Sequence, residues 1–261
     1  MIRLVVSDVD GTMLDETEII PDKISELAEL IEKKNVLFTI ASGREYSQVK
    51  ELEKRLNIQI PIIMCNGTAA RHLNEFAWCE SIPSDLVKQI CELADKQEMT
   101  VVLSLPDAEY AYRKTPFVEK TIVTYGRFEK ILNTEKTPWS ELSVQKLLLI
   151  NDTQKYDFTD LYKVLEQYEN QLTWVDYGRS MDIVPKGCTK AAGVARLASI
   201  LGIPEKEIMA VGDSFNDLEM LKQAGVGVAV NNAVEKLKDT ADYVCREKYL
   251  DGVMEAVEKF C

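Results

Sequence analysis

The chain has 261 residues, of which 46% are hydrophobic and 28% are charged, and its formal net charge is −12. This composition is typical of a folded protein with one or two domains, and it excludes a disordered chain. Charges of both signs are spread along the sequence without a basic stripe, which argues against nucleic acid as a partner.

The sequence shows no targeting or membrane segment. Its start, MIRLVVSDVDG, lacks the apolar length of a signal peptide, and no window approaches the roughly 18 apolar residues of a membrane span. The six cysteines form no CxxC pair, and we expect buried, reduced thiols. These features predict a cytoplasmic protein without a membrane partner.

The first part of the chain alternates between short apolar runs and amphipathic stretches. After Pro21, the residues Ile24, Leu27 and Ile31 recur on one face, which predicts a helix. The alternation predicts parallel strands with helices on both faces of the sheet. The expected elements are strands over 3–7, 36–41 and 61–65, and helices over 22–35 and 45–57.

The middle of the chain, from about 83 to 185, reads as a separate inserted α+β domain. We predict that its linkers are the proline-containing segments 81–84 and 183–187. We therefore predict a catalytic domain of residues 1–82 and 186–261 and an inserted domain of residues 83–185. Within the insertion we expect helices over 84–97, 116–131 and 158–171, and strands over 100–105, 146–151 and 172–177.

The last part of the chain returns to the alternating pattern of the first. Gly202 and Gly225 follow two helical stretches and predict where these helices end. The expected elements are helices over 189–202, 215–225, 232–240 and 250–260, and strands over 207–213, 226–230 and 243–245.

The segment Asp8-Val9-Asp10-Gly11-Thr12 follows the first strand, where ligands of parallel sheets bind. Asp8 and Asp10 share one side of an extended segment, and Gly11 permits a sharp turn. Two carboxylates this close repel, so one should have a raised pKa unless a cation lies between them. The pattern suits a nucleophile beside a general acid, although an ordinary acidic turn is the alternative.

Three further segments follow strands or begin helices. Ser42-Gly43-Arg44 could bind an anion at a helix start or be a plain helix cap. Lys190 opens a helix, where the helix dipole disfavours a cation. A bound phosphate would explain its position, and a solvated surface charge is the alternative. Asp213 and Asp217 lie four residues apart and favour a magnesium site over simple capping. With a single histidine, His72, we do not expect a His/Cys zinc site.

In order and spacing, these segments resemble the haloacid dehalogenase superfamily, and within it the Cof-type sugar phosphatases. The likeness is carried by DVDGT (8–12), SGR (42–44), Lys190 and GDSFND (212–217), with CNGT (65–68) similar to the family's Asn-Gly turn. The resemblance implies an α/β fold: a Rossmann-like parallel-sheet core with an inserted α+β cap domain.

The resemblance also implies roles for the matching positions. Asp8 would attack phosphorus, and Asp10 would protonate the leaving oxygen and then activate water. Magnesium would be held by Asp8, the backbone carbonyl of Asp10, Asp213 and, through water, Asp217. The expected phosphate-binding residues are Thr12, Ser42, Gly43, Lys190 and Asn216, and the candidate substrate contacts are Arg44, Asn66 and Asp182.

The expected activity is magnesium-dependent hydrolysis of phosphate monoesters of small metabolites, with sugar phosphates as the expected class, through an aspartyl phosphate. A phosphomutase or phosphotransferase on the same scaffold is the alternative, and free phosphate release would separate them. A phosphorylated receiver is a rival from another class, but receivers are shorter and lack the insertion. The expected partner is a small phosphorylated metabolite, and the chain could be a monomer or a homodimer.

Overall fold

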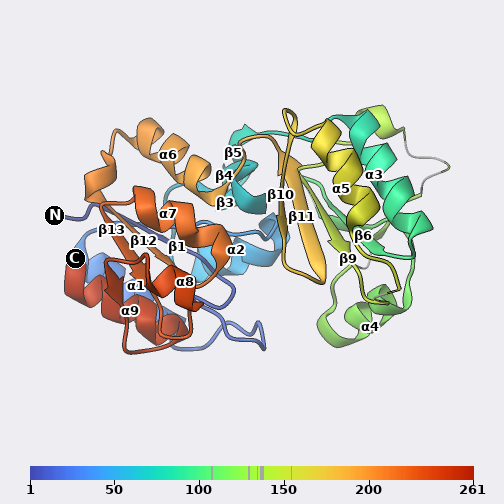
Figure 1. The fold of residues 1–261 in the computed structure, drawn as a ribbon. Coiled ribbons are helices and arrows are strands. Elements are labelled where there is room, and N and C mark those ends of the chain that lie inside the picture. The colour runs from blue at the N-terminus through green and yellow to red at the C-terminus, as the bar shows by residue number, and fades with distance from the viewer. Residues whose placement is uncertain (107, 129, 134, 136–137, 154) are drawn as a thin grey trace. The chain divides into compact units, whose positions relative to one another are not determined.

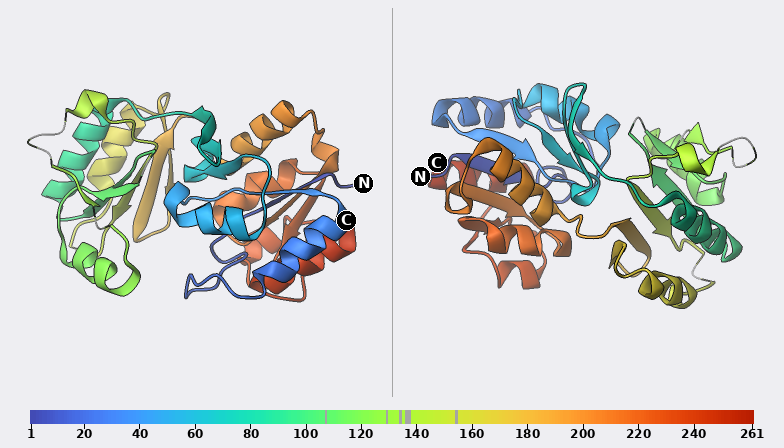
Figure 2. Two further views of the ribbon diagram at one scale, coloured as in Figure 1. Left: turned by 180° about the vertical axis from the view of Figure 1, so that it is seen from behind. Right: turned by 90° about the horizontal axis from the view of Figure 1, so that it is seen from above.

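The chain divides into two compact units, each with a sheet of its own (Figures 1 and 2). The computed structural model describes residues 1–106, 108–128, 130–133, 135, 138–153 and 155–261. The first unit comprises Met1–Arg44, Gln48–Trp78 and Thr189–Cys261, and the second comprises Glu45–Ser47 and Cys79–Cys188. The chain thus leaves the first unit and returns to it.

The first unit is built on a parallel five-stranded sheet with the order β14-β13-β12-β1-β2. The inner strands β1 and β12 are buried along their whole length, because parallel strands are covered on both faces. This sheet and its helices confirm the predicted α/β fold class. The strands are β1 (Leu4–Ser7), β2 (Leu37–Ile40), β12 (Ile208–Gly212), β13 (Val226–Ala229) and β14 (Tyr243–Val244).

Helices cover both faces of this sheet (Figure 1). α1 and α9 lie side by side on one face, and α6 and α7 pack together on the other. α1 buries Ile24, Leu27 and Ile31, the positions that share one helical face. The helices are α1 (Ile24–Lys34), α2 (Tyr46–Arg55), α6 (Lys190–Leu201), α7 (Leu218–Gln223), α8 (Glu235–Lys238) and α9 (Tyr249–Phe260), with 3₁₀ turns η3 (Glu205–Glu207) and η4 (Phe215–Asp217).

The third predicted strand does not extend the parallel sheet as expected. β3 (Ile62–Met64) has one parallel bridge to β2, from Ala41 to Ile63, and otherwise pairs antiparallel with β4 (Ala69–His72). β4 and β5 (Glu75–Cys79) complete a three-stranded sheet. The cause is the turn η1 (Cys65–Gly67), whose three residues have positive φ and reverse the chain.

The second unit carries a six-stranded sheet with the order β10-β11-β9-β6-β7-β8. α3 and α5 pack on one face through a cluster that includes Leu103, Leu147 and Ile183, whereas α4 packs on the other face against Val102. The elements are α3 (Ser84–Lys96), β6 (Thr100–Ser104), β7 (Glu109–Ala111), α4 (Pro116–Tyr125), β8 (Lys130–Ile131), η2 (Trp139–Glu141), β9 (Lys146–Ile150), α5 (Thr159–Gln167), β10 (Leu172–Asp176) and β11 (Ser180–Pro185).

Two expectations for this unit need correction. The segment 183–187, expected to be a linker, begins inside β11, because Ile183 is buried against the helices. The helix expected over 116–131 ends at Tyr125, where Gly126 adopts the left-handed conformation that closes a helix. Residue 129 of that range lies outside the described residues.

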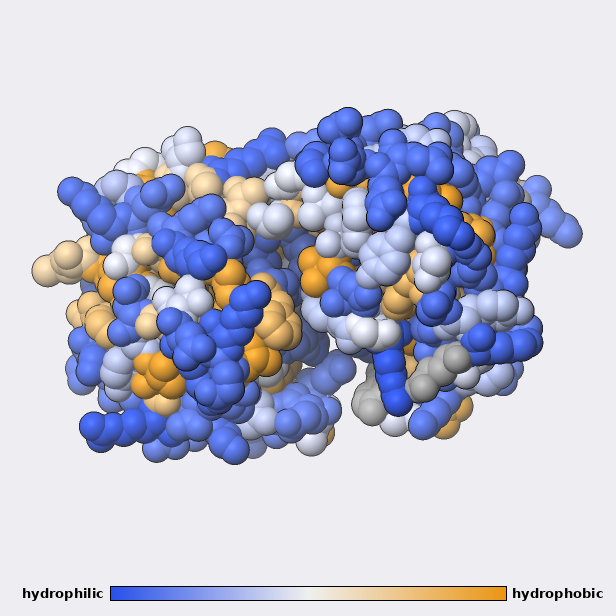
Figure 3. Space-filling view, in the orientation of Figure 1, coloured by the Kyte–Doolittle hydropathy of each residue, from blue (hydrophilic) through white to orange (hydrophobic). Residues whose placement is uncertain are grey.

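Across the described part of the chain, no helix is long and apolar enough to cross a membrane. Hydrophilic residues cover most of the face seen in Figure 3, and the hydrophobic residues on it lie in small groups. Such scattered apolar residues are normal for a protein surface and identify no docking site.

Candidate active site

The predicted acidic residues meet at the carboxyl ends of neighbouring strands. Asp8 directly follows β1 and Asp213 directly follows β12, and these two strands pair in parallel. The backbone N–H of Asp8 donates to Val211 O at 3.0 Å, which continues the ladder to the strand ends. The sheet thereby places two carboxylates together that are about 200 residues apart in sequence.

Gly11 allows the loop after β1 to approach Asp213. Its φ is +75°, and a Cβ on this residue would lie 2.3 Å from Asp213 Oδ2. The next residue, Thr12, is fully buried and donates its hydroxyl to Asp213 Oδ1 at 2.9 Å. Thr12, expected to bind phosphate, therefore orients the Asp213 carboxylate with its side chain.

We predict that Gly11→Ala lowers turnover in addition to straining the backbone. The left-handed conformation costs a non-glycine residue about 1–2 kcal/mol. Gly187, with φ +77° and nothing within 4 Å of an added Cβ, provides the matched control. In Gly187→Ala only the melting temperature should fall, whereas Gly11→Ala should also lose at least about tenfold in turnover because Asp213 must move. Equal turnover in the two variants would contradict this prediction.

Lys190 forms a buried ionic link between two of the carboxylates. It begins α6 after the cap residue Thr189, and its Nζ lies 2.7 Å from both Asp8 Oδ1 and Asp217 Oδ1. Lys190 is 1% exposed, Asp8 3% and Asp217 0%. Burial alone would lower the pKa of Lys190, but Asp217 and Asp8 outweigh it and hold that pKa above its ordinary value. The lysine is therefore a fixed positive charge beside Asp8.

Asp217 is a capping residue that also belongs to this cluster. Its Oδ2 accepts hydrogen bonds from the backbone N–H groups of Asp213 and Ser214, at 3.0 and 3.1 Å, in a capping box. Helix capping was the alternative interpretation of Asp213 and Asp217, and it is correct for Asp217. The Asp213 carboxylate instead accepts a hydrogen bond from Thr12. Both Asp217 oxygens are thus already bonded within the protein.

The residues present fit a divalent cation. Ligand oxygens of Asp8, Asp213 and Asp217 all lie within 4.8 Å of one another. Three carboxylates against the single ammonium of Lys190 leave an excess of about two negative charges in a largely buried place. An all-oxygen set of this kind suits Mg²⁺, which prefers a few carboxylates together with waters and phosphate oxygens.

The crowding of acidic groups in this buried place also raises the pKa values of Asp8 and Asp213. Burial first, and then the neighbouring Asp217, raise the pKa of Asp8 well above its ordinary value, although Lys190 opposes the shift. Burial and Asp217 likewise raise the pKa of Asp213 to about 6. Without a cation, the site therefore favours protonated carboxyl groups.

We predict that the metal-free protein loses stability as the pH rises from about 4 to about 6. Folded Asp213, with a pKa of about 6, holds its proton more tightly than the unfolded chain, whose ordinary value is 3.8. The folded state binds more protons than the unfolded chain between these two pKa values. Raising the pH through this window therefore lowers the free energy of unfolding by up to about 3 kcal/mol. Denaturant unfolding in EDTA at several pH values should show this slope. Asp213→Asn should reduce this slope, with the remainder due to Asp8, whose pKa is also raised, and an unchanged slope in that variant would contradict the assignment.

Ser42, Gly43, Asn66 and Asn216 form the other side of the site. Ser42 is fully buried two residues after β2, and its carbonyl accepts from the Asn66 N–H at 3.0 Å. A Cβ on Gly43 would lie 3.2 Å from Asn66 Oδ1, which also accepts from Asn216 Nδ2 at 3.5 Å. The Oδ1 of Asn216 is buried and has no partner among the described residues. The structure thus brings four predicted residues together, with hydrogen-bonding capacity to spare.

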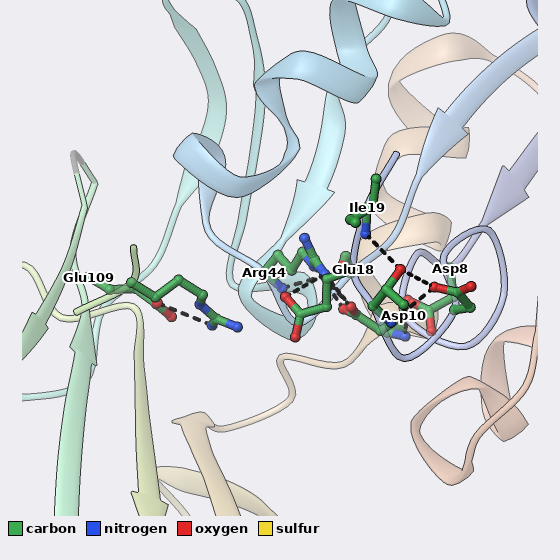
Figure 4. A network of polar contacts seen from close by, with 11 residues as sticks. Asp8, Asp10, Glu18, Ile19, Arg44 and Glu109 are labelled. Carbon is green, nitrogen blue, oxygen red and sulfur yellow. Dashed lines mark hydrogen bonds and ion pairs between the residues drawn. The ribbon is translucent and has the colours of Figure 1, made fainter. Parts of the chain in front are cut away.

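Arg44 lies differently from the expected substrate contact. Its Nε and NH2 donate to the Asp10 carboxylate at 2.5–3.0 Å, and NH2 also donates to Glu18 at 3.2 Å (Figure 4). The Arg44 side chain is 11% exposed, whereas that of Asp10 is 51% exposed. Arg44 therefore fixes Asp10 at the open side of the site through its Nε and Nη2 groups.

Sequence reasoning missed two residues of this region, and one predicted substrate contact, Asp182, lies in the second unit. Glu18 is the second partner of Arg44, and Asn232 donates from Nδ2 to Gly11 O at 2.7 Å. Asn232 could have been found, because the pair Asn231-Asn232 directly follows an apolar strand run. Asp182 lies in β11 of the second unit, in an ion pair with Lys146 at 3.4 Å. It is not among the residues that the first unit brings together.

Known proteins resemble the chain over nearly its whole length. The sequence profile of haloacid dehalogenase-like hydrolases matches residues 5–257. A 5-amino-6-(5-phospho-D-ribitylamino)uracil phosphatase of Bacillus subtilis is 26% identical, covering 98% of this chain and 97% of its own. A phosphoglycolate phosphatase of Methanoculleus marisnigri is 27% identical, with 100% and 97% covered. A solved subclass IIB sugar phosphatase is 25% identical, with 99% and 98% covered and a TM-score of 0.80.

Proposed function

Because the chain belongs to the haloacid dehalogenase-like hydrolases, in their Cof-type branch, we propose that it is a magnesium-dependent phosphatase that releases phosphate from monoesters of small metabolites. The observation that carries the proposal is the buried arrangement of Asp8, Lys190 and Asp213 at one sheet edge. A carboxylate can attack a phosphate dianion only where its negative charge is masked, and these neighbours provide that condition.

In the first step, a carboxylate oxygen of Asp8 forms a bond to phosphorus. The bond from phosphorus to the substrate oxygen breaks, and the leaving oxygen takes a proton from Asp10. The other oxygen of Asp8 is fixed by Lys190 at 2.7 Å, which holds the carboxylate in one orientation. The product of this step is an alcohol and an aspartyl phosphate on Asp8.

In the second step, Asp10 accepts a proton from water as the water oxygen attacks the same phosphorus. The bond between phosphorus and Asp8 breaks, inorganic phosphate leaves, and both carboxyl groups return to their starting states. The half-exposed side chain of Asp10 can meet both the leaving group and water once it turns away from Arg44, which holds it as a carboxylate in this structure.

Phosphate and metal binding use the remaining residues. We assign the phosphate oxygens to Lys190, Asn216, the Ser42 hydroxyl and the backbone at Gly43, with Thr12 acting through Asp213. Asp8, the Asp10 carbonyl and Asp213 would hold Mg²⁺, with Asp217 acting through water. When bound, the ion would neutralise negative charge on the phosphate.

Sugar phosphates are the proposed substrate class, supported by the relative that is a sugar phosphatase and by the phosphoribityl compound named for another. A cytoplasmic location and a monomeric or homodimeric state remain predictions.

A panel of phosphorylated metabolites, assayed in magnesium for inorganic phosphate, tests the proposal. Release of free phosphate from several esters is the expected result. Transfer of the phosphate to a second hydroxyl without free phosphate would instead identify a mutase or phosphotransferase. No reaction with any ester would overturn the proposed function.

A further inference from the structure

Two asparagines follow β13, which pairs in parallel with β12 in the sheet of the first unit (Figure 1). The N–H of Val230 donates to Gly212 O at 3.2 Å, so the two chains stay side by side to the end of β12. Asn231 and Asn232 therefore lie at the carboxyl edge of the sheet, where Asp213 also lies. The proposed reaction gives neither asparagine a role, and their side chains contact different parts of the unit.

The side chain of Asn232 joins two segments that are far apart in sequence. Its Nδ2 donates to Gly11 O at 2.7 Å, and its Oδ1 accepts from the Tyr249 N–H at 3.1 Å. Tyr249 is the first residue of α9, and its N–H is one of those that a helix cannot bond internally. Because α9 buries Leu250 and Val253, it gives the Asn232 amide a firm support.

A helix cap alone would not require an asparagine. The Tyr249 N–H needs only an oxygen, which aspartate, serine or threonine would also provide. Gly11 O needs a donor at the same time, and of these side chains only the amide of asparagine carries a donor and an acceptor on separate atoms. The contact with Gly11 O therefore explains why Asn232 is an asparagine.

The bond from Asn232 restrains a residue that has little restraint of its own. Glycine has more conformational freedom than other residues, and the carbonyl of Gly11 belongs to the planar peptide unit that joins it to Thr12. Fixing this unit fixes the start of Thr12, whose hydroxyl donates to Asp213 Oδ1 at 2.9 Å. A Cβ on Gly11 would lie 2.3 Å from Asp213 Oδ2, so a shift of Gly11 also displaces that carboxylate.

The loop that carries Asn232 holds the main chain of Asp213 as well. The N–H of Val234 donates to Asp213 O at 2.9 Å. The loop thus restrains Asp213 through its backbone and, by way of Gly11 and Thr12, through its carboxylate. A metal ligand that is already held in place loses less freedom when the ion binds, so the affinity for the ion is higher.

We propose that Asn232 is a positioning residue for the magnesium site, and that it raises the affinity for the ion by holding Gly11 and, through it, the Asp213 carboxylate. This inference deepens the proposed function and rests on its assignment of Mg²⁺ to Asp8 and Asp213. Asn232 acts on the ion only through Asp213, so the loss of its amide should be measurable as weaker magnesium binding.

Magnesium binding without substrate tests this role. Calorimetry would titrate magnesium chloride into the unaltered protein, Asn232→Ala and Asn231→Ala. Asn231 is the matched control, because its Nδ2 donates to Cys245 O and Arg246 O, at 3.3 and 2.7 Å. Each change removes two hydrogen bonds of a side chain and should lower the melting temperature by a similar amount. Only Asn232→Ala should weaken magnesium binding, by about five- to tenfold.

The magnesium dependence of phosphate release gives a second readout. In Asn232→Ala, the magnesium concentration for half-maximal release should rise by the same factor as the dissociation constant. A merely structural role would lower the melting temperature and leave this concentration unchanged, as we expect for Asn231→Ala. Equal magnesium affinity in the two variants would overturn the inference.

A measurement on the unaltered protein keeps the test decisive if Asn232→Ala does not fold. Coupling between two sites is reciprocal, so bound magnesium should in turn affect the contacts of Asn232. In isotope-labelled protein, magnesium should shift the NMR signals of the Asn232 side-chain amide and leave those of Asn231 in place. Equal responses of the two amides would overturn the inference.

The two proposals fail in different ways. Magnesium binding that weakens only in Asn232→Ala, together with no phosphate release from any ester, would overturn the proposed function and leave this inference intact. An unaltered protein that binds no magnesium would overturn both.

Discussion

Asp8→Asn should fold normally and lose turnover by about 10⁴-fold or more, because an amide cannot form the aspartyl phosphate. The substitution keeps the shape of a fully enclosed side chain, and Asp217 remains as a partner for Lys190. Removing a carboxylate whose pKa burial has raised should not lower stability at neutral pH. Phosphate release under saturating substrate and magnesium would measure the loss.

The control for this prediction is Asp22→Asn, since the side chain of Asp22 is fully exposed and lies outside the site. Its turnover should equal that of the unaltered chain. Matching melting curves for the three proteins would show that the Asp8 variant is folded. If that folded variant kept more than a few per cent of activity, Asp8 would not be the nucleophile.

The strands and motifs of the first unit could be predicted because local pattern and topology agree there. Apolar runs such as 207–213 are buried on both faces, so nearly every residue of the strand carries the signal. Acidic residues that follow β1 and β12 must then meet, because parallel strands end at the same edge. The parallel fold thus predicts Asp8 and Asp213 at one edge, and the pairing of β1 with β12 makes them direct neighbours.

Other features depend on contacts that no local pattern encodes. β4 and β5 form because a turn with three positive φ angles reverses the chain, and in the sequence only the pair Asn66-Gly67 indicates such a turn. A Cβ on Gly67 would lie 2.1 Å from Thr189 O, so a close approach to the start of α6 makes glycine necessary. The contact between Arg44 and Glu18 could not be predicted from the sequence either, since Glu18 lies in a loop without periodicity.

The second unit shows most clearly what a local sequence pattern cannot predict. Its strands were partly found from their apolar residues, but a strand with one face against helices says little about its other face. The neighbours of Ser104 are set by the pairing of β6 with β7 and β9, which are far apart in sequence. The side chains beside Ser104 are therefore known only from that pairing.

Removal of magnesium should abolish activity, and its return should restore it. Asp8, Asp213 and Asp217 concentrate more negative charge than Lys190 can balance, and the raised pKa values of Asp8 and Asp213 reflect that excess. A phosphate dianion brought to this place without a cation would meet repulsion from all three carboxylates. Assays after EDTA treatment and dialysis, followed by a magnesium titration, would measure the dependence.

Binding of the ion should also be visible without any substrate. Magnesium should raise the melting temperature of the unaltered protein, because a ligand that binds only the folded state stabilises it. Asp213→Asn should weaken this effect and shift the magnesium titration of activity to higher concentrations. Glu219→Gln, at an exposed acid just after Asp217, should change neither. Full activity in a chelated protein, together with a melting temperature that magnesium does not change, would exclude the ion from this cluster, and the excess charge would then need another explanation.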